Sequence, residues 1–390
     1  MRPLNSVFSG LGTTIFTVMS ALAAEHGAIN LGQGFPDDEG PDDVRAAAAK
    51  AILDGPNQYP PMMGLPALRQ AVAEANKRFY GLNVDWQKEV MVTSGATEAL
   101  HDCLTALLNP GDEAIIFEPA YDSYRPVIEA AGAKVVAVPL EPPRWSLPME
   151  KLEAAFSDRT KLVLVNTPMN PIGKVFTRDE LAAIAALMKR HDAYAVCDEV
   201  YEHLVFSGHT HVPLMTLPGM RERTLRIGSA GKTFSLTGWK IGYVTGPAHL
   251  VETVAKTHQF VTFTTAPGLQ AAVAYGLGKD DGYFASLASA LEAKRDLLAR
   301  GLADAGFGVL PADGTYFVSA DFRPLGFNGT DEEFCREITM KAKVAAIPLS
   351  AFYSTPDAPR HLARFCFCKQ DAILTEASAR LKAYAKGGAV

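Results

Sequence analysis

The feature of this 390-residue chain that most constrains its fold is a series of short apolar runs separated by helical patterns. From about residue 90 these runs read "EVMVTS", "EAIIFEP", "AKVVAVPL", "KLVLVNTP", "AYAVCDE", "RTLRIGS" and "IGYVTG". Several of them are apolar at consecutive positions, which is typical of strands that are covered on both faces. The pattern therefore predicts an α/β fold, in which a mainly parallel sheet lies between helices.

The segments between these runs have the periodicity of amphipathic helices. They include "TEALHDCLTALL" after Gly95, "YDSYRPVIEAAG" ending at Gly132, and "TRDELAAIAALMKRH". In the last of these, Thr177 and Glu180 have the spacing of a capping box at the start of a helix. Parallel strands joined by such helices place ligands at the carboxyl ends of the strands.

The pattern changes after about residue 275, which indicates a second, smaller α+β domain. A long charged helix over 283–306 precedes a strand-like segment, another helix from Asp331, and the strand "RFCFC". We expect residues 1–40 to form an N-terminal arm and part of the small domain. Residues 41–275 would form the large domain, and residues 276–390 the small C-terminal domain.

The composition is that of an ordinary globular protein, with 48% hydrophobic and 21% charged residues. The formal net charge of −6, without a basic stripe, argues against nucleic acid as a partner. Five cysteines without a CxxC pair predict reduced thiols and a cytoplasmic location. At the N-terminus we prefer an amphipathic helix around Ile15, Met19 and Leu22 over a signal peptide, and we expect no membrane span.

Two local motifs have an ordinary structural interpretation. Cys366 and Cys368 alternate along a predicted strand and would share one face, where we expect them to be small core residues. His209 and His211 resemble a metal-binding pair, but no neighbouring ligand in the sequence completes a set. We therefore expect a solvated loop there and no metal.

Polar residues follow several of the predicted strands. Ser94, Gly95, Ala96 and Thr97 lie between a strand and a helix, where backbone N–H groups can receive a phosphate, although many purely structural turns look the same. The rigid loop "NTPMNPIG" carries Asn170, and "CDEVYE" ends a strand with Asp198. That aspartate is as well suited to capping a helix as to holding a cationic ring nitrogen.

The stretch "SAGKTFSLTGWKIG" places Lys232 and Lys240 among small residues near two strand ends. A buried lysine near other cations has a depressed pKa and becomes an amine nucleophile that can form a Schiff base. The second lysine would then stay charged. Arg364 lies in the otherwise apolar strand "HLARFCFCK", where a buried guanidinium requires an anion, either in a structural salt bridge or on a ligand.

The order of "TSGATEAL", "EPAYDSY", "NTPMNPIG", "DEVYE", "SAGKTFSLTGWKIG" and "RFCFCK" resembles the class I aminotransferases of fold type I, which use pyridoxal 5′-phosphate. The resemblance covers almost the whole chain, and its subgroup contains kynurenine, glutamine and methionine aminotransferases. It implies a large cofactor-binding domain with a mainly parallel seven-stranded sheet.

The resemblance also implies roles for the residues around the cofactor ring. Lys232 would bond covalently to the cofactor and, once displaced by substrate, move a proton. Asp198 would keep the ring nitrogen protonated so that the ring accepts electrons. Asn170 and Tyr201 would hydrogen-bond the ring's 3-oxygen, and Tyr121 would stack on the ring face.

The phosphate and the substrate would take the remaining residues that the resemblance points to. The phosphate would contact Ser94, Gly95, Ala96, Thr97, Ser229, Lys240, and Tyr59 from a second subunit. The substrate would contact Arg364 through its α-carboxylate, with Gly34, Asn170, Phe16 and, from the side-chain pocket, Tyr59, Thr264 and Thr265. Much of the wider family has Arg where Lys240 stands and Ser where Gly231 stands, so the phosphate contact here would depend more on Ser229 and the backbone.

The function that the resemblance implies is transfer of an amino group from an L-amino acid to a 2-oxo acid through a pyridoxamine form of the cofactor. No cation appears among the candidate pocket residues, so we expect a neutral or aromatic donor such as methionine, glutamine or kynurenine. The alternatives are a cysteine-S-conjugate β-lyase and an N-succinyldiaminopimelate aminotransferase. A non-enzymatic regulator would need a DNA-binding module, which we do not expect. We expect a homodimer with composite active sites, small-molecule substrates, and no nucleic acid or membrane partner.

Overall fold

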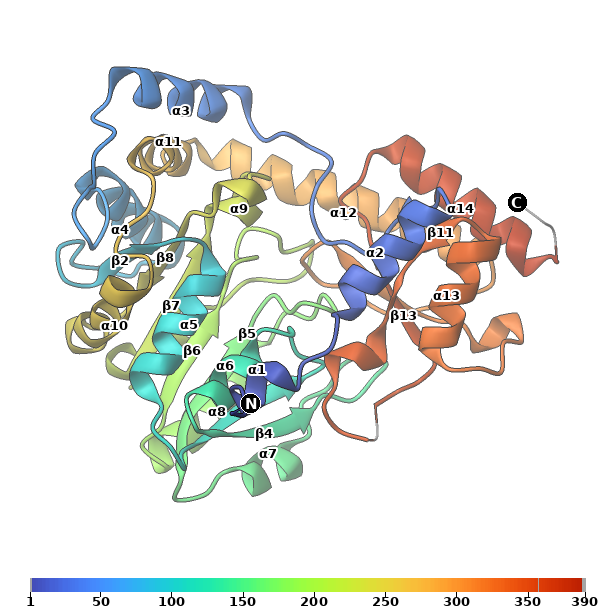
Figure 1. The fold of residues 1–390 in the computed structure, drawn as a ribbon, viewed down its shortest axis with the longest axis horizontal. Helices are drawn as coiled ribbons and strands as arrows, with labels where there is room; N and C mark the ends of the chain where they lie inside the picture. Colours follow the sequence, from blue (N-terminus) through green and yellow to red (C-terminus); the bar gives the residue numbers. More distant parts are fainter. Residues whose placement is uncertain (1, 357, 388–390) are drawn as a thin grey trace.

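The computed structural model describes residues 2–356 and 358–387, and its centre is a seven-stranded sheet (Figure 1). The strand order is β2-β8-β7-β6-β5-β3-β4. The strands are β2 (Val90–Thr93), β3 (Glu113–Glu118), β4 (Lys134–Pro139), β5 (Thr160–Asn166), β6 (Tyr194–Asp198), β7 (Thr224–Ser229) and β8 (Gly242–Thr245). Each apolar run of the sequence forms one of these strands, so the predicted α/β fold with a mainly parallel sheet is confirmed.

The only antiparallel neighbours in this sheet are those of β8. It pairs antiparallel with β2 and with β7, whereas the other neighbouring strands are parallel. In the register of the central strands, Asn166 lies opposite Asp198, and Ser229 lies opposite Gly242. Gly242 also lies opposite Thr93. The carboxyl ends of β2, β5, β6 and β7 therefore meet the beginning of β8 at one edge of the sheet.

Helices cover both faces of this sheet, as two-sided burial of the strands requires. Those that the sequence predicts are α5 (Ala96–Leu107), α6 (Tyr124–Ala130) and α8 (Arg178–Arg190), and α8 begins with the expected capping box of Thr177 and Glu180. Further helices in this part of the chain are α3 (Asp42–Asp54), α4 (Pro66–Tyr80), α7 (Met149–Ala155), α9 (Ala230–Thr233), α10 (Ala248–Val261) and α11 (Pro267–Leu277). Short 3-10 turns are η1 (Leu214–Thr216), η2 (Arg221–Arg223) and η3 (Thr237–Trp239).

The C-terminal part contains a second, antiparallel sheet with the strand order β12-β13-β10-β9. Its strands are β9 (Gly308–Val309), β10 (Phe317–Asp321), β12 (Ile347–Pro348) and β13 (Leu362–Cys366). It is accompanied by α12 (Asp281–Asp304), α13 (Asp331–Lys341), α14 (Asp371–Ala385), η4 (Arg323–Leu325) and η5 (Leu349–Phe352). The long helix α12 runs from the large sheet to this part of the molecule (Figure 1). The exact domain boundaries stay a prediction.

The N-terminal segment packs on the C-terminal part. The short α1 (Ser6–Ser9) precedes α2 (Ile15–Glu25), which begins after an N-cap at Thr14 and contacts α13. The strand β1 (Ile29–Asn30) pairs in parallel with β11 (Val344–Ala345). The predicted amphipathic helix is thus present as α2, with Met19 and Ala23 buried.

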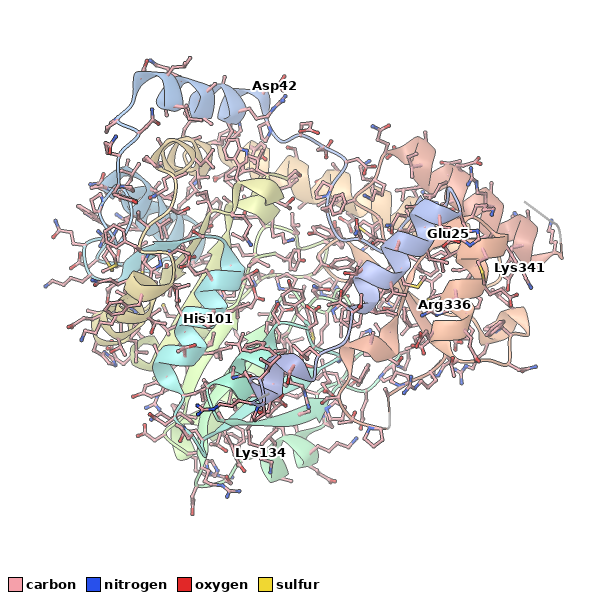
Figure 2. All side chains as sticks on the ribbon, viewed as in Figure 1. Glu25, Asp42, His101, Lys134, Arg336 and Lys341 are labelled. Atoms are coloured by element: carbon pink, nitrogen blue, oxygen red, sulfur yellow. The ribbon has the colours of Figure 1, made fainter. Side chains whose placement is uncertain are left out.

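Charged side chains such as Glu25, Asp42 and Lys341 lie exposed on the outer helices (Figure 2). Over the described residues, none of the helices combines the length and the apolarity needed to cross a membrane.

Candidate active site

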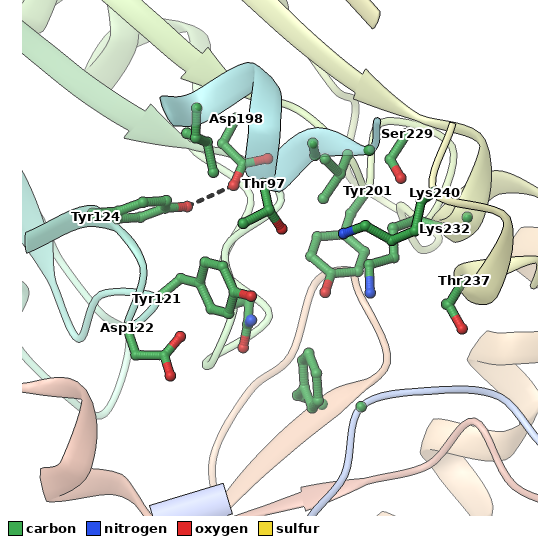
Figure 3. A pocket seen from close by; sticks show the side chains of 18 of the residues that line it. Thr97, Tyr121, Asp122, Tyr124, Asp198, Tyr201, Ser229, Lys232, Thr237 and Lys240 are labelled. Carbon is green, nitrogen blue, oxygen red and sulfur yellow. Dashed lines mark hydrogen bonds between the residues drawn. The ribbon is translucent and has the colours of Figure 1, made fainter. Parts of the chain in front are cut away.

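A cavity of about 380 Å³ opens at the edge of the large sheet where the strand ends meet. Its wall is formed by residues of both sheets and of α2. It brings together most of the residues that the sequence singled out: Phe16, Gly34, Gly95, Ala96, Thr97, Tyr121, Asn170, Asp198, Tyr201, Ser229, Lys232, Lys240 and Arg364. Figure 3 shows the side chains of Lys232, Lys240 and Ser229 on one side of this cavity and those of Tyr121 and Asp122 on the other.

Asp198 ends β6 and is buried at the base of the cavity. One carboxylate oxygen, Oδ2, accepts a hydrogen bond of 2.7 Å from the hydroxyl of Tyr124 (Figure 3). The other, Oδ1, is buried and has no partner among the described residues. Burial raises the pKa of Asp198, and the bond from Tyr124 opposes this effect. A buried oxygen without a donor predicts that a ligand supplies one.

Lys232 lies on α9, directly after β7, with its amino group in the cavity. Its Nζ donates to the hydroxyl of Tyr316 at 3.0 Å, and that hydroxyl donates to the carbonyl of Gly34 at 2.8 Å. Burial lowers the pKa of Lys232. A larger share of neutral amine is what a nucleophilic lysine requires.

Lys240, Ser229 and the turn after β2 form the corner of the cavity next to the sheet edge. Lys240 has left-handed backbone, with φ 54°, and a Cβ placed on Gly95 would lie 3.1 Å from its Nζ. A Cβ on Gly242 would lie 2.5 Å from the carbonyl carbon of Gly95, so only glycine fits there. The corner thus presents a cation, a hydroxyl and the N-terminus of α5, which is a suitable arrangement for a phosphate.

Arg364 is buried on β13 and lines the cavity from the second sheet. Its Nη1 donates to Oδ1 of Asn170 at 3.0 Å, and its Nη2 donates to the carbonyl of Gly32 at 2.5 Å. Burial lowers the pKa of Arg364 to about 10. The guanidinium carbon lies 4.1 Å from the ring centre of Phe317. Among the described residues no carboxylate makes an ion pair with Arg364, so a structural salt bridge does not explain its burial.

Four of the sequence candidates do not line this cavity. Ser94 faces a separate surface hollow. Its backbone N–H donates a hydrogen bond to the carboxylate of Glu98. Tyr59 is 83% exposed, and its ring packs edge-on against Phe263 at 5.6 Å. Thr264 and Thr265 follow on the same segment and are also outside the cavity wall.

The prediction of a solvated loop at His209 and His211 is wrong for His211. Its side chain is buried, and its Nε2 lies 3.0 Å from a carboxylate oxygen of Glu199. Arg226 donates to the same oxygen at 2.6 Å. The sequence spacing concealed this contact because Glu199 belongs to a strand end twelve positions earlier. Cys366 and Cys368 share one face, as predicted, and both are buried.

Three further residues of the site were missed. Tyr124 and Asp122 belong to the motif "EPAYDSY", and the first holds Asp198 while the second lines the cavity wall. Tyr316 lies 84 positions from Lys232 in the chain. The spacing of Tyr124 one helical turn after Tyr121 was a usable signal, whereas nothing local to Tyr316 pointed to Lys232.

These residues fit pyridoxal phosphate on the structural evidence alone. The buried Oδ1 of Asp198 has no partner among the described residues and could accept from a ring N–H, and the Lys232 amine lines the same cavity. Lys240, Ser229 and the backbone of Gly95, Ala96 and Thr97 line that cavity as well and would suit a phosphate. When bound, the cofactor ring supplies the electron sink that the protein's side chains lack. The fold and this arrangement of residues match what the sequence resemblance to aminotransferases of fold type I implies.

Comparisons with known proteins agree with this class. Residues 26–381 match the family described as aminotransferase class I and II, and the chain belongs to that family. A probable N-succinyldiaminopimelate aminotransferase from Mycobacterium tuberculosis is 45% identical over 384 residues, with 96% of each chain covered. The methionine aminotransferase of Escherichia coli is 42% identical over 372 residues, covering 95% of this chain and 96% of that protein.

Solved structures show the same relationship. The N-succinyldiaminopimelate aminotransferase structure from Mycobacterium tuberculosis matches with a TM-score of 0.95 at 46% identity, covering 97% of this chain and 99% of that chain. The structure with a methionine aminotransferase function from Escherichia coli matches with a TM-score of 0.94 at 41% identity, covering 98% and 100%.

Proposed function

We propose that this aminotransferase moves the amino group of a neutral or aromatic L-amino acid, such as methionine, glutamine or kynurenine, to a 2-oxo acid in two half-reactions. The observation that carries this proposal is the charge of the cavity wall. Its cations among the described residues are Lys232, Lys240 and Arg364. The proposal uses Lys232 for covalent attachment, Lys240 for the phosphate and Arg364 for the α-carboxylate, so none of these three cations is left for an acidic side chain. Asp122 adds a negative charge to the wall.

The proposal assigns a role to each candidate residue that the cavity brings together. Lys232 would hold the cofactor covalently through its amine and, once displaced by the substrate, would move the proton at the substrate Cα. Asp198 would accept the ring N–H through Oδ1, while Tyr124 donates to its other oxygen. Asn170 and Tyr201 hold the ring's 3-oxygen, and Tyr121 covers the ring face. Arg364 is already oriented by Asn170 and Gly32, so its guanidinium is positioned before the substrate's α-carboxylate arrives.

The phosphate corner is proposed to use the backbone of Gly95, Ala96 and Thr97 together with Ser229 and Lys240. Gly34 and Phe16 are proposed to contact the substrate. A Cβ on Gly34 would lie 2.4 Å from the ring of Phe317, so a side chain there would displace that ring. Ser94 contributes through its backbone, which orients the turn.

We further propose a cytoplasmic homodimer in which Tyr59 reaches the phosphate of the partner subunit. The support is the strong exposure of Tyr59 beside Phe263, outside the cavity of its own chain. Thr264 and Thr265 follow Phe263 directly and would face the partner's substrate in the same arrangement.

A second candidate donor is N-succinyldiaminopimelate. It is favoured by the 45% identity to the probable N-succinyldiaminopimelate aminotransferase of Mycobacterium tuberculosis. Its additional carboxylates would need further cations, and a buried unpaired charge costs several kcal/mol. A β-lyase activity on cysteine S-conjugates remains an alternative use of the same site.

The test is a comparison of kcat/KM for methionine, glutamine, kynurenine, aspartate and N-succinyldiaminopimelate with one common 2-oxo acid. We expect a neutral or aromatic donor to lead the acidic ones by about tenfold or more, which corresponds to about 1.4 kcal/mol in the transition state. A lead of the same size for either acidic donor would overturn the proposed donor class and leave the aminotransferase assignment intact.

A further inference from the structure

A buried charged cluster lies behind the phosphate corner and takes no part in the proposed chemistry. Glu98 and Asp102 lie one turn apart on α5, the helix that begins at this corner, and His258 faces them from α10. Exposure is 8% for Glu98 and zero for the other two residues. Ionisable groups at such depth need a structural or functional reason, because burial without compensation is costly.

Both ring nitrogens of His258 face hydrogen-bond acceptors. Nδ1 lies 3.0 Å from Oε1 of Glu98, and Nε2 lies 3.2 Å from the carbonyl oxygen of Met62. A carbonyl only accepts, and an ionised carboxylate only accepts, so both nitrogens donate and the ring is an imidazolium. Asp102 adds a second negative charge, with Oδ2 3.6 Å from Nδ1.

The surroundings of His258 support this charge state. Burial disfavours a charged ring, but the two nearby carboxylates, Asp102 at 3.6 Å and the hydrogen-bonded Glu98, outweigh it and raise the pKa of His258 to about 9. These two carboxylates are the titratable groups that act most strongly on the ring, and His101 acts on Asp102 in turn. The three groups also have the spacing of metal ligands. A ring that donates through both nitrogens has no lone pair for a metal, so we do not assign one.

The imidazolium joins two segments that are distant in the sequence. Glu98 accepts the backbone N–H of Ser94 through Oε2, which fixes the beginning of the 94–97 turn. Met62, on the other side of the ring, lies three residues after Tyr59. His258 therefore contacts the loop that carries Tyr59 directly, and it reaches the phosphate turn of its own subunit through Glu98.

We propose that His258 is a positioning residue that connects the 94–97 turn to the 59–64 loop. In each subunit this one imidazolium would align two parts of the protein: the subunit's own phosphate turn, and the Tyr59 that reaches the partner's site. This inference rests on the proposed cofactor and dimer. It goes beyond them by assigning the alignment to a residue that touches neither the cofactor nor the substrate.

Two substitutions separate the two contacts. In His258→Asn the amide nitrogen replaces Nδ1, which keeps the bond to Glu98 and removes the bond to Met62. In His258→Gln the amide nitrogen replaces Nε2, which keeps the bond to Met62 and removes the bond to Glu98. His249→Gln, on the exposed surface of the same helix, is the matched control.

The first measurement is hydrogen–deuterium exchange on the cofactor-free protein. We expect His258→Asn to increase exchange in residues 59–64 more than in 94–97, and His258→Gln to do the reverse, with no change in His249→Gln. In the wild type, protection of both segments should decrease as the pH rises through about 9, after correction for the intrinsic rate. The sign follows from a pKa raised above its ordinary value of 6.5, because such stabilisation is complete below that value and is lost as the pH passes the folded-state pKa. Equal exchange in all variants, or the same pH trend in the two His258 variants, would overturn the proposal.

The second measurement is titration of the same proteins with pyridoxal phosphate. We expect both His258 variants to bind it about tenfold more weakly at pH 7.5, and His249→Gln to bind like the wild type. Unchanged affinity in the His258 variants overturns the positioning role. Failure of the wild type to bind overturns the proposed function instead, and the exchange measurement still decides whether the tie exists.

Discussion

Asp198 and Arg364 are each buried with one polar atom that no described residue satisfies. In Asp198 this atom is Oδ1, and in Arg364 it is Nε. Folding leaves few such atoms, because each costs about 1–3 kcal/mol. Both side chains line the same cavity, which indicates that they are kept for a ligand with a donor for Asp198 and an anion for Arg364.

We predict that Arg364→Lys raises KM for the amino acid and for the 2-oxo acid by about tenfold or more, with a smaller effect on kcat. A lysine loses the bidentate geometry and the bonds to Asn170 and Gly32 that orient the group. Steady-state kinetics with both substrates measure the effect. Arg360→Lys is the control, because Arg360 is exposed and lies near the same strand. A KM within twofold of the wild type would show that Arg364 does not bind the carboxylate.

For single residues, the sequence predicted those that stand in a recognisable local motif. Lys232, Asp198 and Asn170 each stand in a short motif at a strand end, and the structure brings them to one cavity. Tyr316 was missed because its contact with Lys232 depends on how two distant segments pack. For the same reason, the burial of His211 against Glu199 was not visible in the spacing of the histidines.

The strands show what can be predicted for single elements. Runs such as 113–118 and 160–166 are apolar on both faces, which predicts buried strands, and both have a neighbouring strand on each side in the sheet. The sequence did not indicate that β8 runs antiparallel, because apolar runs carry no information about direction. That reversal brings the beginning of β8 to the end of β2, where Gly242 meets the 94–97 turn.

At the scale of these two elements we predict that Gly242→Ala weakens pyridoxal phosphate binding and lowers the free energy of unfolding by about 1–3 kcal/mol. The new Cβ would lie 2.5 Å from the carbonyl carbon of Gly95 and 2.7 Å from the nitrogen of Ala96, so the turn would have to move. Urea unfolding and cofactor titration measure both effects. Gly238→Ala is the control, because nothing lies within 4 Å of its Cβ position. Equal behaviour of the two variants would refute the close approach.

Over the whole molecule, sequence patterns could not predict that the N-terminal segment packs against the C-terminal part. β1 pairs with β11, and α2 packs on α13, which places Phe16 at the cavity. Local periodicity predicts α2 as an amphipathic helix but does not name its partner. The boundary expected at residue 40 stays a prediction.

Several apolar side chains remain strongly exposed on the isolated chain. Leu53, Tyr59 and Phe260 have 84%, 83% and 86% of their surface accessible. Exposed large apolar residues of this kind mark interaction surfaces. They agree with the proposed dimer, in which a second subunit covers this region.

We predict that mixing two inactive proteins, Lys232→Ala and Tyr59→Ala, restores part of the activity. A hybrid dimer would then contain one site with both residues intact, since Lys232 and Tyr59 of that site come from different chains. Activity is measured after subunit exchange, which is followed with differently labelled proteins. Exchange without any recovery, or a stable and active monomer, would contradict the composite site.

The central claim is that Lys232, and not Lys240, holds the cofactor covalently. The most direct test is borohydride reduction of the purified protein with pyridoxal phosphate, followed by peptide mass spectrometry. Because burial lowers the pKa of the Lys232 amine, we predict a phosphopyridoxyl group on the peptide that contains Lys232, and none on Lys240. Modification of Lys240, or of neither lysine in protein that transfers amino groups, would contradict the account.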